Sequence, residues 1–128
     1  MFYLPEFLFS QSKNNNCQSV KNGFFYYYPQ GKSENYKIIR NGQLYQEINM
    51  QTNDTVTWRL NWNENCTFTL KFVEKSGLVS DLDKRIYSSM TIIIRILLIR
   101  KKYYIFSTEL EGRQKPYLVT DTAWFNKK

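Results

Sequence analysis

The chain has 128 residues, no histidine, two cysteines and a net charge of +7 at pH 7. A chain of this length forms one domain, and an aromatic content of 17% favours strands over helices. The lack of histidine excludes a Ser-His-Asp triad, a Cys-His dyad and an imidazole metal site.

The first sixteen residues differ in composition from the rest of the chain. Residues 1–9 are apolar apart from Glu6, and a polar stretch follows them. A secretory signal contains such an apolar segment with a basic region before it, and this sequence shows the apolar segment without the basic region. We expect residues 1–16 to be a signal remnant, a disordered arm or a short strand, and residues 17–128 to be a single β-barrel-like domain.

Strands are expected first over residues 23–28, 35–40 and 43–49. The first is rich in aromatic residues and ends at Pro29. Asn41 and Gly42 separate the other two, and Asn-Gly is the strongest short hairpin signal because both residues tolerate a positive φ.

The clearest hairpin covers residues 56–72. Apolar residues alternate with polar ones on both sides of a predicted turn at residues 63–65, as expected of an antiparallel pair with one buried face. The residues predicted to face inward are Val56, Trp58, Leu60, Trp62, Cys66, Phe68, Leu70 and Phe72.

The second half of the chain predicts a long connection and three further strands. Residues 74–89 break the alternation, and we expect one helical turn there. Residues 91–99 are almost continuously β-branched, which predicts a strand buried on both faces. The remaining strands are expected at residues 103–110 and 117–125. About eight sequential strands with short links predict an all-β antiparallel meander that forms a barrel or a curled sheet.

Cys17 and Cys66 are 49 positions apart. Two cysteines without histidine do not make a zinc site, and the spacing is not that of a CxxC redox pair. We predict a disulfide between them, and the alternative is a pair of buried thiols in a reducing compartment.

The first half of the chain contains several short motifs: Val20-Lys21-Asn22-Gly23, Ile39-Arg40-Asn41-Gly42, Gln46-Glu47-Ile48-Asn49, Thr52, and Trp62 with Cys66. These motifs resemble those of small exported proteins of flavobacteria and their relatives, which are lipocalin-like and mostly uncharacterised. The resemblance covers residues 17–72 well and the rest loosely. It implies export and the Cys17–Cys66 bridge, and it transfers no active site.

Aromatic side chains on the inward face have two interpretations. They either fill the core or surround a cavity for an apolar ligand at a barrel mouth. If a cavity exists, its expected walls are Trp58, Trp62, Phe68, Phe72 and Phe106.

A basic surface is expected at Arg95, Arg100, Lys101 and Lys102, beside two tyrosines. Small barrels that bind single-stranded nucleic acid combine charge and stacking rings in this way. A disulfide points to a compartment with little nucleic acid, so nucleic acid is the weaker of the expected partners.

The sequence therefore predicts a secreted, periplasmic or envelope protein that binds rather than catalyses, with no cofactor and no metal site. The expected partner is an apolar small molecule held in the barrel. The alternatives are an envelope interaction module with a filled core, and a barrel that binds single-stranded nucleic acid. The most apolar run, residues 90–99, is too short to cross a bilayer as a helix and contains Arg95.

Overall fold

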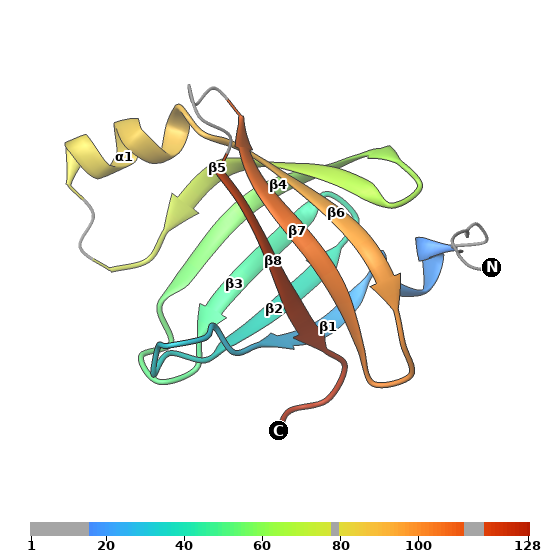
Figure 1. Ribbon diagram of the computed structural model, residues 1–128. Helices are drawn as coiled ribbons and strands as arrows, with labels where there is room; N and C mark the ends of the chain where they lie inside the picture. Colours follow the sequence, from blue (N-terminus) through green and yellow to red (C-terminus); the bar gives the residue numbers. More distant parts are fainter. Residues whose placement is uncertain (1–15, 78–79, 112–116) are drawn as a thin grey trace.

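In the residues that the structure describes, eight antiparallel strands follow one another around a closed barrel (Figure 1). The structure is a computed structural model, and it describes residues 16–77, 80–111 and 117–128. The predicted all-β meander is confirmed, and of the two predicted forms the barrel is the one observed. The strands are β1 (Gly23–Tyr27), β2 (Tyr36–Asn41), β3 (Leu44–Asn49), β4 (Thr55–Glu64), β5 (Thr67–Lys75), β6 (Thr91–Ile99), β7 (Tyr103–Glu111) and β8 (Tyr117–Trp124).

The barrel closes through a short contact between its first and last strands. β1 pairs with β8 only at Tyr26↔Trp124 and Tyr27↔Ala123, whereas β8 pairs with β7 along its full length. Pro29 lacks the N–H that a continued ladder would need, so β1 ends early. The first part of β8 therefore extends past the end of β1.

The predicted β4–β5 hairpin is present, and the residues predicted to share its inner face are neighbours in it: Trp58↔Phe72, Leu60↔Leu70 and Trp62↔Phe68. Its turn comes at residues 65–66, slightly later than predicted, so Cys66 lies in the turn. The expectation that residues 91–99 are buried on both faces is wrong. Leu97 of β6 is 51% exposed, because a barrel strand has only one covered face.

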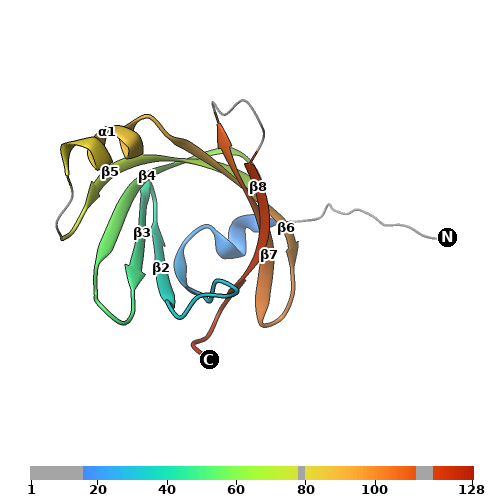
Figure 2. The same ribbon diagram turned by 60° about the vertical axis from the view of Figure 1, so that its left-hand side comes forward.

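One end of the barrel is closed by a short 3-10 helix, η1 (Cys17–Val20). Figure 2 shows this N-terminal segment within the outline of the ring of strands. Cys17 and Val20 are each 1% exposed and belong to the hydrophobic core. A disulfide joins Cys17 to Cys66, which ties η1 to the β4–β5 turn. The predicted bridge is therefore present.

A buried arginine completes the closed end. Arg40 of β2 is 2% exposed, and its guanidinium donates hydrogen bonds to the Val20 carbonyl (2.6 and 3.2 Å) and to the Tyr104 hydroxyl (2.8 Å). It also lies 4.1 Å from the centre of the Phe25 ring. Cation–π contact and hydrogen bonds together offset part of the cost of burying this charge.

The opposite end carries the β1–β2 loop, the β3–β4 turn and one helix, α1 (Asp81–Ser88). Ser80 caps α1 by accepting a hydrogen bond from the Asp83 N–H (3.1 Å). On the inner side of the helix, Tyr87 stacks on Phe72 with ring centres 4.9 Å apart. α1 thus packs on β5 at the rim of the barrel, where Figure 1 shows it projecting outward. Within the described ranges, neither this helix nor η1 has the length and apolarity needed to traverse a bilayer.

Candidate functional site: a cavity at the open end of the barrel

The interior of the barrel contains a cavity of about 200 Å³ toward the α1 end. Its walls are inward-facing residues of the seven strands from β1 to β7, and most of them are apolar or aromatic. Strand pairing explains this grouping, since directly paired residues share a face: Ile38 lies beside Glu47, and Leu70 beside Ile92. The full lining is Tyr27, Ile38, Tyr45, Glu47, Trp58, Leu70, Ile92, Ile94, Phe106 and Thr108.

Glu47 is the one carboxylate in this lining. Its strand neighbours on the inner face are Ile38 and Val56, which offer it no polar group. Among the residues that the structure describes, the carboxylate has no hydrogen-bond or ion-pair partner. Burial raises the pKa of Glu47 above its ordinary value. An acidic group of this kind is costly to maintain in the charged form without a partner.

Aromatic rings surround the cavity and contact one another. Tyr27 stacks on Tyr36, with ring centres 6.2 Å apart, and meets Phe106 edge-on at 5.9 Å. Trp58 meets Tyr87 of α1 edge-on at 6.2 Å. These contacts restrain Tyr27, Phe106 and Trp58, three of the four aromatic residues in the cavity lining.

Tyr45 and Tyr36 lie near Glu47, and the pKa of each phenol is raised. Burial raises the pKa of Tyr45 well above its ordinary value, and the nearby Glu47 carboxylate adds to the effect. Burial also raises the pKa of Tyr36, with smaller contributions from Glu34 and Glu47. Both phenols therefore stay protonated at neutral pH and can donate a hydrogen bond.

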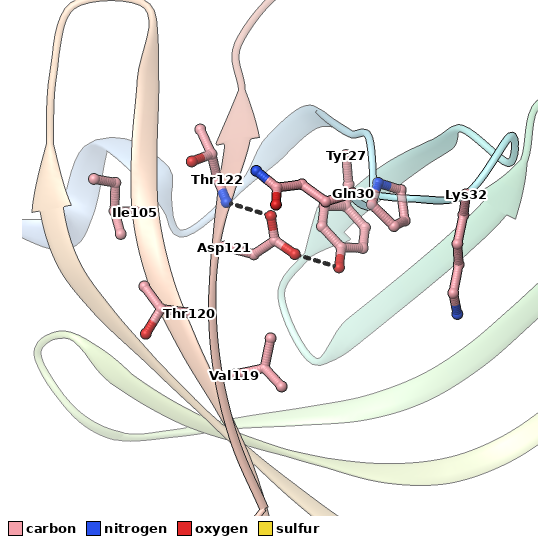
Figure 3. A pocket seen from close by; sticks show the side chains of 9 residues that line it. Tyr27, Gln30, Lys32, Ile105, Val119, Thr120, Asp121 and Thr122 are labelled. Atoms are coloured by element: carbon pink, nitrogen blue, oxygen red, sulfur yellow. Dashed lines mark hydrogen bonds between the residues drawn. The ribbon is translucent and has the colours of Figure 1, made fainter.

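A larger and more open hollow of about 460 Å³ lies outside this cavity, between β8 and the β1–β2 loop. Figure 3 shows Tyr27 and Asp121 pointing toward one another in it. The Tyr27 hydroxyl donates to the Asp121 carboxylate at 2.7 Å, and the Thr122 N–H donates to the other oxygen at 3.0 Å. Tyr27 lines both hollows, so its ring forms part of the wall between them.

The predicted wall residues lie in different parts of the barrel. Trp58 and Phe106 line the internal cavity. Phe68 is 0% exposed and packs deeper in the core, with its ring 4.7 Å from that of Trp62. Trp62 lies under Lys21 near η1, and Phe72 packs between β5 and α1. Sequence reasoning missed Glu47, although the alternation of β3 places it on the same face as Tyr45.

The predicted basic residues are all exposed but do not form one cluster. Arg95 lies on the outside of β6 and forms an ion pair with Glu109 at 2.8 Å. Arg100, Lys101 and Lys102 lie in and beside the β6–β7 turn, at the same end of the barrel as η1.

Comparison with protein-family models and with curated proteins finds no match for this chain. In the described part of the chain, no group of three or more acidic or cysteine side chains is arranged to hold a metal ion.

Proposed function

We propose that the protein is a non-catalytic binding protein that holds one small, largely apolar molecule inside its barrel. The observation that carries the proposal is the cavity of about 200 Å³ between Trp58, Phe106 and the aliphatic residues of β5 and β6. Binding sites for small molecules are typically concave and apolar, with few polar groups that fix the orientation of the ligand. Glu47 and the nearby phenols are polar groups of that kind.

The volume of the cavity limits the size of the ligand. At about 30 Å³ per water molecule, the cavity has the room of about seven waters. Most sites for drug-sized molecules are larger, at about 300–1,000 Å³. A ligand of roughly ten non-hydrogen atoms, such as a single substituted aromatic ring, fits this space.

The same proposal includes export to the cell envelope or beyond. Its support is the Cys17–Cys66 disulfide, since such bonds persist in oxidising compartments. The resemblance to small exported lipocalin-like proteins agrees with this location.

The experiment compares binding of a small neutral probe, 2-(4-fluorophenyl)ethanol, to the protein and two variants by ¹⁹F NMR and calorimetry. Ile92→Trp adds a large side chain to the cavity lining, whereas Ile93→Trp adds the same side chain one position along β6, on the other face. Binding to the parent and to Ile93→Trp, with loss in Ile92→Trp, is the expected result.

The alternatives make different predictions in the same experiment. Equal binding to all three proteins, or no binding to any, contradicts an internal site. No binding to any of them favours an envelope interaction module. If the protein instead binds single-stranded oligonucleotides at physiological salt, with affinity that falls steeply as salt rises, the basic turn at residues 100–102 is the functional surface.

A further inference from the structure

We propose that the ligand of the internal cavity carries a positively charged group, and that the Glu47 carboxylate receives it. The inference rests on the proposed function and specifies the chemical class of the ligand: a small organic cation with an apolar or aromatic body. The site it requires is the cavity lined by Glu47, Tyr27, Tyr45 and Trp58.

The first argument is the isolation of the carboxylate. Buried polar groups in proteins nearly always have a hydrogen-bond partner, and an exception calls for an explanation. Glu47 borders the cavity with Ile38 and Val56 beside it, and no described residue donates a hydrogen bond to its carboxylate. A ligand that brings an ammonium group would supply both the missing donor and the missing charge.

The second argument is the nature of the remaining walls. Trp58, Tyr27, Tyr45 and Phe106 line the same cavity as Glu47. Aromatic faces attract cations, and the attraction increases when the site is shielded from water. A carboxylate together with several rings is therefore suited to an organic ammonium group, and unsuited to an anionic ligand.

The charges around the site agree with this assignment. The cation on the inner face, Arg40, lies toward the closed end, where the Val20 carbonyl and the Tyr104 hydroxyl hold its guanidinium. Asp121 lies beyond Tyr27 and accepts hydrogen bonds from Tyr27 and Thr122. Other charged or titratable groups toward the open end include Lys32 and Glu34 of the β1–β2 loop and Tyr36 of β2. Further ones belong to the β3–β4 turn, the end of β5 and α1: Asp54, Glu74, Lys75, Asp81, Asp83, Lys84, Arg85 and Tyr87.

The test uses a matched pair of probes that differ in one group: 2-(4-fluorophenyl)ethylamine, which is a cation at neutral pH, and 2-(4-fluorophenyl)ethanol. Binding of both is measured by ¹⁹F NMR and calorimetry at pH 7.5. Glu47→Gln keeps the shape of the side chain and removes its charge. Glu64→Gln makes the same change at an exposed position in the β4–β5 hairpin, at the closed end of the barrel.

We expect the amine to bind about tenfold or more tightly than the alcohol, the usual effect of a hydrogen bond between charged groups. Glu47→Gln should abolish this preference while leaving affinity for the alcohol nearly unchanged, and Glu64→Gln should preserve the preference. Amine binding should also weaken as the pH falls and Glu47 becomes protonated, whereas alcohol binding should not.

Two outcomes overturn the inference in distinguishable ways. If both probes bind equally and Glu47→Gln changes neither affinity, the cavity binds ligands but does not select cations. If neither probe binds, the proposed function fails together with the inference.

Discussion

Removal of the disulfide should destabilise the barrel by an amount that follows from its position in the chain. Cys17 and Cys66 are separated by 49 positions, so the bond closes a loop of about 50 residues. The loss of unfolded-chain entropy predicted for such a loop corresponds to about 4 kcal/mol at 25 °C. A domain of this size has a total stability of about 5–15 kcal/mol, so the bond contributes a large share of it.

The measurement is urea unfolding of the protein and of a Cys17→Ala/Cys66→Ala variant, followed by tryptophan fluorescence. With a slope of about 2 kcal/mol/M, the midpoint should fall by about 2 M. Reduction of the parent before unfolding is the control for the lost sulfur atoms, because it opens the loop without removing them. Reductant should have no effect on the variant.

If loss of the disulfide lowers the free energy of unfolding by less than about 1 kcal/mol, this reasoning is refuted. Such a result would mean that the contacts of η1 with the barrel, above all the Arg40 hydrogen bonds to the Val20 carbonyl, hold the closed end without the covalent link.

Three further predictions concern buried or partly buried polar groups. Tyr27→Phe removes the 2.7 Å hydrogen bond to Asp121 and should lower the free energy of unfolding, measured with urea, by about 1 kcal/mol. Asp121→Asn should lower the free energy of unfolding less in the Tyr27→Phe background than in the parent, and additive losses would contradict the pairing. Arg40→Met leaves the Val20 carbonyl without its hydrogen-bond donor and should lower the free energy of unfolding by about 2 kcal/mol, because the lost hydrogen bonds outweigh the relief of the buried charge. An unchanged urea midpoint would contradict this prediction. The folded-state pKa of Glu47 is raised, so its contribution to stability is full below the unfolded-state pKa and is lost as the pH rises through the folded-state pKa. Glu47→Gln should therefore become more stable relative to the parent across that pH interval. Parallel profiles of unfolding free energy against pH for the two proteins would argue against this prediction.

The strand order could be predicted from the sequence because the alternation of apolar and polar residues specifies both the strands and their inner faces. Trp58, Leu60 and Trp62 face inward opposite Phe72, Leu70 and Phe68, as their pattern indicates. The Asn41–Gly42 turn also lies between the two strands that it was expected to join.

The cavity was harder to predict because its walls come from strands far apart in the chain. Alternation shows that Trp58, Phe68 and Phe106 all face inward, but it does not give their depth along the barrel axis. That depth depends on strand stagger, which places Phe68 in the core and Phe106 at the cavity. Glu47 was missed for a related reason: a charged residue in a strand is usually assigned to the solvent face.

The most direct test of the account is a calorimetric titration of the parent protein with 2-(4-fluorophenyl)ethylamine, repeated with Ile92→Trp and Ile93→Trp. The account predicts one bound amine per chain in the parent and in Ile93→Trp, and none in Ile92→Trp. Retention of the amine by Ile92→Trp with unchanged affinity would contradict a ligand site inside the barrel.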